Sequence, residues 1–183
     1  MIVGKNRTQV LRALPLVIGL PTAATANAQH GFYAGANVSF LDFAVDGSPS
    51  ASPSTASFRL GRRFEFLATE IRLGGGLSNS QTSAFGTPVD VKVDQILSLL
   101  LKGMIPITRE HSPYVIVGRT DAQVTTRIAG FSFVDSFTNE FSYGIGLDWA
   151  ISRNVSINAE WARLLQGSNY RVDALTLGVD FKF

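Results

Sequence analysis

Apolar and polar residues alternate with a period of two over much of this chain. The pattern is clearest over residues 175–183, where every odd position is apolar and every even position is Thr, Gly, Asp or Lys. This is the pattern of a β-strand with one apolar face and one polar face. Seven similar stretches lie upstream, at 32–40, 58–63, 69–74, 91–102, 114–124, 140–149 and 155–161. The chain is therefore predicted to be all-β, with eight strands joined by short links.

One of these stretches has a less distinct apolar face than the others. In residues 91–102 the contrast is blurred by Ile96 and Leu100, which fall on the polar side. We assign the apolar faces as Val91, Val93, Leu97, Leu99 and Leu101 in this stretch and Tyr114, Ile116 and Val124 in the next. The polar faces are then Lys92, Asp94, Ser98 and Lys102 in the first and Arg119, Asp121 and Gln123 in the second.

Alternation alone also fits a soluble β-sandwich, so other features must decide where the apolar face points. Many glycines lie on the polar face, where a narrow lumen would crowd them, and large aromatics lie near strand ends, as in membrane interfaces. The glycines are Gly35, Gly61, Gly74, Gly76, Gly144, Gly146 and Gly178, and the aromatics are Phe32, Tyr114, Trp149, Trp161 and Phe183. In hydrocarbon a sheet satisfies its backbone only by closing on itself. We therefore predict an eight-stranded antiparallel up-and-down transmembrane β-barrel.

The first 28 residues have the pattern of a secretory signal peptide. Lys5, Arg7 and Arg12 precede a short apolar core at 13–20, and small residues follow. Cleavage is expected after Ala28, with Ala26 as a second site, so the barrel domain is predicted to span residues 29–183. The alternative is an N-terminal membrane anchor, but the apolar core is less than half of the ~20 residues that a spanning helix needs.

Removal of this segment changes the sign of the net charge. The chain has 16 Lys and Arg against 14 Asp and Glu, and three of the bases but none of the acids lie in residues 1–28, giving 13 − 14 = −1. The basic character therefore belongs to the signal, and no nucleic-acid partner is expected. Cysteine is absent, so the mature protein is expected to be stable without disulfides.

Several motifs resemble the small outer-membrane barrels of the OmpA, OmpX and opacity-like type. They are the residues at 31–35 (GFYAG), 112–115 (SPYV), 143–149 (YGIGLDW) and 179–183 (VDFKF). The resemblance implies a barrel in the outer membrane of a Gram-negative bacterium, with both termini periplasmic. It also implies that the last strand, ending at Phe183, is recognised by the outer-membrane assembly machinery. Longer members add a peptidoglycan-binding domain after the barrel, and because this chain stops at Phe183 we do not expect that role here.

Two hairpin registers predict ion pairs inside the lumen. A turn at 64–65 places Arg59 opposite Glu70, and a turn at 129–130 places Arg119 opposite Glu140. Buried charges need partners, so we interpret these residues as a structural network that fills the interior, with a proton or ion path as the alternative. Further charged residues expected in this network are Lys92, Asp94, Asp121, Asp148 and Glu160.

The connections on the outer side are the candidate binding surfaces. Loops are expected at 42–55, 78–88 and 164–169, with inner turns at 64–65 and 152–154 and a longer inner link at 104–113. The hairpin around 129–130 is expected to be long, with Phe131 and Phe133 at a tip that projects and binds a surface ligand. The alternative is an aromatic girdle or a mobile loop.

The sequence offers little chemistry for catalysis. The two histidines, His30 and His111, fall on the inner side of the expected topology, and no His or Cys spacing suits a metal, so no metal or cofactor is expected. We therefore predict a non-enzymatic outer-membrane surface protein, envelope-structural or adhesive through its outer loops. A narrow pore is the first alternative and an outer-leaflet lipid-modifying enzyme the second. Expected partners are membrane lipids and lipopolysaccharide, the assembly machinery and a host or cell-surface ligand.

Overall fold

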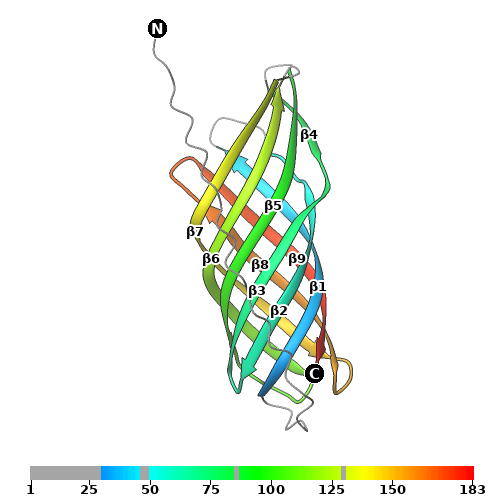
Figure 1. The fold of residues 1–183 in the computed structure, drawn as a ribbon. Coiled ribbons are helices and arrows are strands. Elements are labelled where there is room, and N and C mark those ends of the chain that lie inside the picture. Colours follow the sequence, from blue (N-terminus) through cyan, green and yellow to red (C-terminus); the bar gives the residue numbers. More distant parts are fainter. Residues whose placement is uncertain (1–29, 46–49, 85–86, 129–130) are drawn as a thin grey trace, which may run out of the picture.

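The computed structural model describes residues 30–45, 50–84, 87–128 and 131–183, and these residues form an antiparallel all-β structure (Figure 1). The strands are β1 (His30–Val45), β2 (Ser54–Phe64), β3 (Leu67–Ser78), β4 (Ser80–Ala84), β5 (Thr87–Met104), β6 (His111–Ile128), β7 (Phe131–Ala150), β8 (Val155–Gln166) and β9 (Tyr170–Lys182). Among these residues no helix is long and apolar enough to cross a membrane.

The sheet closes on itself between its first and last strands. Every strand pairs with its sequence neighbour except β3 with β4, and β1 also pairs with β9 from Tyr33↔Lys182 to Val45↔Tyr170. Strands β3 and β4 both pair with β5 and are separated only at Asn79, so they occupy one position in the barrel. The described segments therefore form a closed eight-stranded antiparallel barrel, and the predicted architecture is confirmed.

Both ends of the described chain lie at the same end of the barrel, here called the terminal end (Figure 1). The turns at this end are short: Glu65 and Phe66 join β2 to β3, residues 151–154 join β7 to β8, and residues 105–110 join β5 to β6. Glu65 has a φ of 52°, the left-handed conformation that a tight turn requires. The two expected inner turns therefore lie within about a residue of their predicted places, and the longer inner link is 105–110 instead of the expected 104–113.

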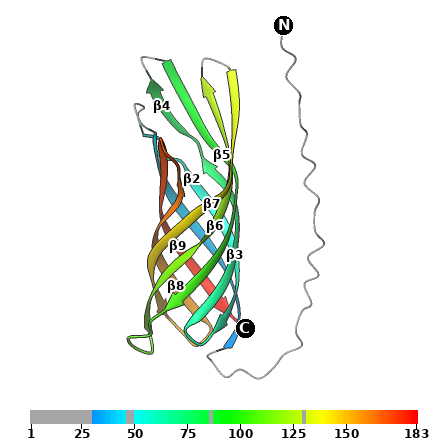
Figure 2. The same cartoon turned by 90° about the vertical axis from the view of Figure 1, so that its left-hand side faces the viewer.

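The opposite end, here called the distal end, has longer strands than the sequence pattern indicated. β1 continues to Val45, and β4 and β5 occupy most of the loop expected at 78–88. Strands β4 to β7 extend past the rest of the barrel as two hairpins, as Figure 2 shows. The expected turn at 129–130 and the middle of the first outer loop, 46–49, lie outside the described residues.

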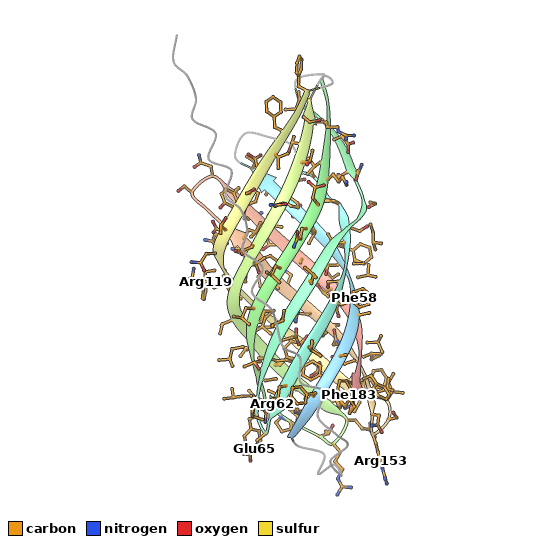
Figure 3. All side chains as sticks on the ribbon, viewed as in Figure 1. Phe58, Arg62, Glu65, Arg119, Arg153 and Phe183 are labelled. Carbon is orange, nitrogen blue, oxygen red and sulfur yellow. The ribbon has the colours of Figure 1, made fainter. Side chains whose placement is uncertain are left out.

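Most of the predicted faces agree with the structure. On β2, Phe58 is 77% exposed and points away from the barrel, while its neighbour Arg59 is 2% exposed in the lumen (Figure 3). The same alternation holds over the stretches predicted for β1, β3, β8 and β9, where apolar side chains face outward and polar ones inward. Nearer the distal end, the apolar residues Leu41, Leu165 and Val172 are buried as well. The outward residues form a continuous apolar belt, including Val38, Phe40, Ile71, Leu73, Leu97, Leu99, Ile145, Trp161, Leu175, Leu177 and Phe181.

Two predicted faces are wrong, on β5 and β6. A β-bulge between Val93 and Gln95 reverses the alternation within β5, so Val93 is buried and Asp94 is exposed. On β6 all four residues from 114 to 117 are apolar, so alternation does not show which face is which. The larger side chains, Tyr114 and Ile116, fill the lumen and are 2% and 1% exposed. Val115 and Val117 face outward instead.

Candidate functional site: a charged lumen and a projecting sheet

The lumen is centred on Arg72, whose guanidinium contacts two carboxylates. Its NH2 group donates a hydrogen bond of 2.7 Å to Glu160 Oε2, its NH1 group donates to the other oxygen of the same carboxylate, and its Nε donates to Glu70. All three side chains are at most 8% exposed. A guanidinium that binds a carboxylate at two points is the strongest common ion-pair geometry, so Arg72 compensates two buried negative charges.

Two tyrosines complete the hydrogen bonding of these carboxylates. Tyr33 donates to Glu70 Oε2 at 2.6 Å, and Tyr114 donates to Glu160 Oε2 at 3.0 Å. Each ring lies over a glycine, Tyr33 over Gly61 and Tyr114 over Gly146, in space that any side chain at the glycine would occupy. The lumen is therefore crowded at these two glycines, which explains their place in otherwise regular strands.

A second cation, Arg59, lies next to this cluster. Its guanidinium is 3.7 Å from Glu70 Oε2 and 3.4 Å from Asp180 Oδ1, and its NH2 group donates to Asn158 Oδ1 at 2.8 Å. Nearer the terminal end, Lys102 pairs with Asp148 at 2.7 Å and its Nζ lies 3.8 Å from the centre of the Tyr114 ring. We call these nine residues the lumen network: Tyr33, Arg59, Glu70, Arg72, Lys102, Tyr114, Asp148, Glu160 and Asp180.

The structure brings Arg59 and Glu70 together, but in a different register from the one expected. The turn falls at 65–66, so Glu70 pairs with Gly61 and Arg59 pairs with Arg72. The two side chains still meet as diagonal neighbours on one face. Glu160 and Asp148 also lie in the lumen, as expected. The central residue Arg72 was missed as a site, although its position on the polar face of its strand was a usable signal.

The predicted ion pair between Arg119 and Glu140 is wrong. Arg119 pairs with Phe141, points away from the barrel and donates to the Asn139 carbonyl at 2.7 Å (Figure 3). Glu140 lies on the inner side, where its Oε1 accepts a hydrogen bond of 2.9 Å from Tyr170.

A β-bulge on β7 is the physical reason. The expected register holds from Ile128↔Phe131 to Ala122↔Phe137, and then an extra residue shifts Thr120 opposite Glu140. Asn139 has a φ of 59°, and its backbone N–H donates to Asp121 Oδ1 at 2.5 Å.

Three further charged residues expected in the lumen lie on the outer surface. Asp121 is exposed, and Lys92 and Asp94 form a pair at 3.2 Å with side chains 50% and 32% exposed. The bulge in β5 moves Lys92 and Asp94 to the outer face. Asp121 lies outside because the two faces of β6 are the reverse of those predicted.

The projecting part of β7 has a free edge. Its residues pair with β6 along the whole length, but pairing with β8 begins only at Tyr143. Residues 131–141 therefore present one unpaired side of the backbone at the distal end, in the part of the chain that the structure describes. Phe131, Phe133 and Val134 are 72%, 55% and 66% exposed along this segment. An exposed apolar edge of this kind is a template for strand addition.

Aromatic side chains surround the barrel at the terminal end. Phe181 and Phe183 stack with ring centres 6.5 Å apart, and the Phe183 N–H donates to the Phe32 carbonyl at 3.0 Å. The guanidinium of Arg62 lies over the rings of Phe32 and Phe64, at 5.3 and 4.8 Å. Rings and a long cationic side chain at one level are typical of a membrane–water interface.

A closed barrel with an apolar outer belt, an aromatic girdle and a charged, packed interior defines the transmembrane β-barrel proteins. Residues 13–183 match the family model for the outer membrane protein beta-barrel domain. The chain therefore belongs to this family and is an outer-membrane protein. A search of curated proteins gave no match.

Solved structures share the fold at low sequence identity. Neisserial surface protein A superposes with a TM-score of 0.63 at 17% identity, covering 84% of this chain and 97% of its own. Ail, the attachment invasion locus protein of Yersinia pestis, gives 0.60 at 18% identity, covering 84% and 99%. The N-terminal barrel of Pseudomonas aeruginosa OprF gives 0.56 at 14% identity, covering 81% and 97%.

Proposed function

We propose that this protein is a non-enzymatic surface protein that binds another protein through its projecting sheet. The proposal rests on the free edge of β7. Along this edge the backbone is not paired with β8, and the side chains of Phe131, Phe133 and Val134 are exposed. Main-chain hydrogen bonds along such an edge give affinity, and alternate side chains give specificity. An extended, apolar segment of a host or cell-surface protein fits this chemistry.

The proposal requires the distal end to face the outside and both termini to face the periplasm. Strands β4 to β7 extend past the rest of the barrel at the distal end, whereas the terminal end has turns only. This supports the orientation, because outer-membrane barrels have short periplasmic turns and longer extracellular segments. The same assignment makes residues 1–28 a cleaved signal and the final strand, with Phe183, the segment that the assembly machinery reads. The apolar belt then contacts lipid and the distal rim contacts lipopolysaccharide.

A polyanionic sugar is a less suitable ligand for the distal rim. Ail has been crystallised with the heparin analogue sucrose octasulfate, so a barrel of this fold can hold such a ligand. In this chain, however, Arg163 at the distal end is engaged by Asp173 through hydrogen bonds of 2.7 and 3.0 Å. That pairing reduces the positive charge that Arg163 offers to a sulfated sugar.

A surface-binding assay tests the proposal. Cells displaying the protein are expected to bind immobilised host-surface proteins. The double variant Phe131→Ser and Phe133→Ser is expected to lose most of this binding while it still reaches the membrane. The matched control is Ser168→Ala and Asn169→Ala in the neighbouring distal connection, which leaves the β7 edge intact. Equal binding by both variants would contradict the role of the edge.

A narrow pore is the alternative, and the packed lumen counts against it. Arg59, Glu70 and Glu160 are each at most 2% exposed and fill the interior with paired charge. An outer-leaflet lipid-modifying enzyme is supported still less, because His111 stacks on Trp149 at the terminal end, with ring centres 5.6 Å apart.

A further inference from the structure

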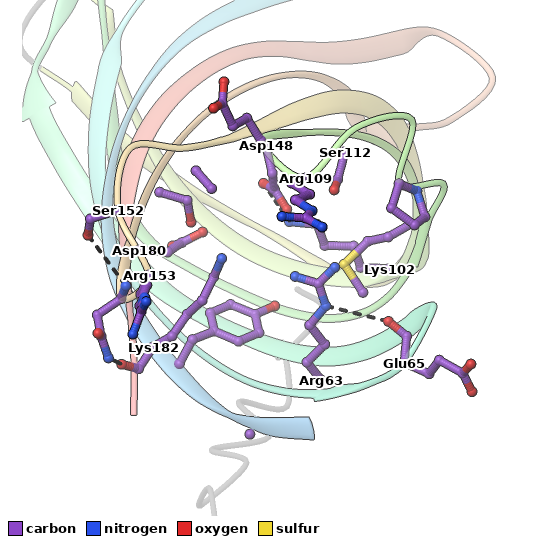
Figure 4. Close-up of a pocket in the computed structure, with 18 of the residues that line it drawn as sticks. Arg63, Glu65, Lys102, Arg109, Ser112, Asp148, Ser152, Arg153, Asp180 and Lys182 are labelled. Atoms are coloured by element: carbon purple, nitrogen blue, oxygen red, sulfur yellow. Dashed lines mark hydrogen bonds and ion pairs between the residues drawn. The ribbon is translucent and has the colours of Figure 1, made fainter. Parts of the chain in front are cut away.

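A cavity of about 910 Å³ opens at the terminal end of the barrel, below the lumen network (Figure 4). Its inner limit is formed by Tyr33, Lys102, Asp148 and Asp180, so it ends at the packed lumen. Its walls come from distant parts of the chain: the start of β1, the ends of β2, β5 and β9, and the links at 105–110 and 151–154. The volume lies within the usual range for small-molecule sites.

Cations outnumber acids on these walls once the ion pairs are taken into account. Asp148 pairs with Lys102 at 2.7 Å, and Asp180 lies 3.4 Å from Arg59, which is also 3.7 Å from Glu70. Among the described residues no carboxylate lies within 4.0 Å of the charged groups of the four other cations, which are Arg63, Arg109, Arg153 and Lys182. The two other acids of the wall are Glu65, whose side chain points away from the cavity in Figure 4, and the exposed Glu110.

Two of these cations are held by the sheet on either side of β1. Arg63 pairs with Gly31 across the β1–β2 ladder, and Lys182 pairs with Tyr33 on the β9 side. Strands two apart in a sheet lie about 10 Å from one another. Between the two cations β1 contributes Gly31, which has no side chain, and Tyr33, whose ring lies over Gly61. Figure 4 shows Arg63 and Lys182 directed toward the cavity from these two sides.

The wall is also apolar over part of its area. Phe66, Met104 and Pro106 line one side, and Phe183 lines another. A ligand that uses both kinds of wall has an organic body and a group of more than one negative charge. Guanidinium groups match the oxygens of phosphate geometrically, and a second cation stabilises its second charge.

We propose that this cavity binds a small soluble organic phosphate, held by Arg63 and Lys182 inside and by Arg109 and Arg153 at the rim. The site is separate from the projecting sheet, so this proposal does not depend on the proposed binding of a surface protein. If the terminal end faces the periplasm, as proposed above, the ligand comes from that compartment.

Titration calorimetry of the folded chain in nanodiscs of zwitterionic lipid tests the site, with phenyl phosphate as the probe. Phenyl phosphate is expected to bind more tightly than inorganic phosphate, which lacks the apolar body, and more tightly than benzoate, which has one charge. Binding is expected to weaken as salt is added. Failure of phenyl phosphate to bind, or equal affinity for benzoate, would overturn the proposal.

Neighbouring arginines provide matched variants. Arg63→Gln with Lys182→Gln is expected to weaken phenyl phosphate binding by roughly tenfold or more, because two charge-assisted contacts are lost. Arg62→Gln removes the same kind of charge from the outer face and is expected to leave the affinity unchanged. Equal loss in the two proteins would show that only general charge matters and would overturn the site.

Two further measurements address misfolding of the inner double variant and the source of the phosphate. Arg109 and Arg153 lie in links outside the strands, so Arg109→Gln and Arg153→Gln test the site even if the inner double variant does not fold. Unchanged affinity for phenyl phosphate in both of these variants would count against the proposed site. Phosphatidylglycerol added to the nanodiscs is expected not to compete. Displacement of phenyl phosphate by this lipid would assign the cavity to a lipid headgroup and overturn the soluble ligand.

Discussion

Arg72 on β3 and Glu160 on β8 bind each other across the full width of the barrel. Three barrel strands separate them in each direction, β2, β1 and β9 on one side and β5, β6 and β7 on the other. The contact is made at two points, one of them a hydrogen bond of 2.7 Å. Because this buried pair joins opposite walls, the lumen network holds the two sides of the barrel together as well as filling its interior. We call this role of the Arg72–Glu160 pair the brace.

Replacing Arg72 with Met is expected to destabilise the barrel strongly. The variant keeps similar bulk but leaves Glu70 and Glu160 without their shared cation. Removing one partner of a buried pair costs about 3–5 kcal/mol, because the remaining charge is uncompensated. Reversible urea unfolding in lipid bilayers, followed by tryptophan fluorescence, measures the free energy of unfolding.

Arg171→Met is the control for this experiment. The Arg171 side chain is 57% exposed and lies 4.0 Å from Asp173, so its loss is expected to change stability by less than about 0.5 kcal/mol. Addition of Glu160→Gln to Arg72→Met removes one of the unpaired charges and is expected to recover part of the loss. Equal stability of the Arg72→Met and Arg171→Met variants would contradict the brace.

Gly146→Ala tests the crowding of the lumen. A Cβ at this position would overlap the Tyr114 ring, and overpacking of this kind costs about 1–3 kcal/mol. At Gly103 the nearest atom would be 3.5 Å from an added Cβ, so Gly103→Ala is expected to be neutral or slightly stabilising. The same urea unfolding assay compares them, and a neutral Gly146→Ala would argue against a packed interior.

The architecture was predictable because alternation with period two survives wherever a strand has one lipid face and one lumen face. Phe58 and Arg59 are the clearest example, since these two consecutive residues face the lipid side and a buried ion pair respectively. The same reasoning failed where the sheet departs from regular pairing. No local signal distinguished the bulges at Asp94 and Asn139 from ordinary strand, and each reversed the faces beyond it.

The composition of the lumen network was less predictable than the fold. Arg72, Lys102 and Asp180 could be assigned to the inner face, but which charges meet depends on the stagger between strands around the closed barrel. Arg72 and Glu160 are 88 residues apart, and no hairpin register relates them. The terminal cavity likewise depends on links and strand ends that come together only after closure.

An arginine introduced into the apolar belt tests the membrane-facing assignment. Leu177 is 53% exposed on the outer face of β9, so Leu177→Arg is expected to destabilise the folded barrel in bilayers by about 2–4 kcal/mol if it lies near the midplane. Ser168→Arg in the exposed connection between β8 and β9 carries the same charge at the distal end and serves as the control. Equal stability of the two variants would mean that Leu177 does not face hydrocarbon.

Conductance in planar bilayers tests whether the lumen network closes the barrel. The wild-type protein is expected to give no stable unitary conductance, because Arg72 and its two carboxylates fill the interior. Arg72→Ala removes the largest of these groups while Glu70 and Glu160 stay negative, so any conductance that opens is expected to favour cations. Arg62→Ala, on the outer face, controls for general loss of charge and is expected to stay silent. Stable wild-type conductance that Arg72→Ala leaves unchanged would contradict the closed lumen and support the pore.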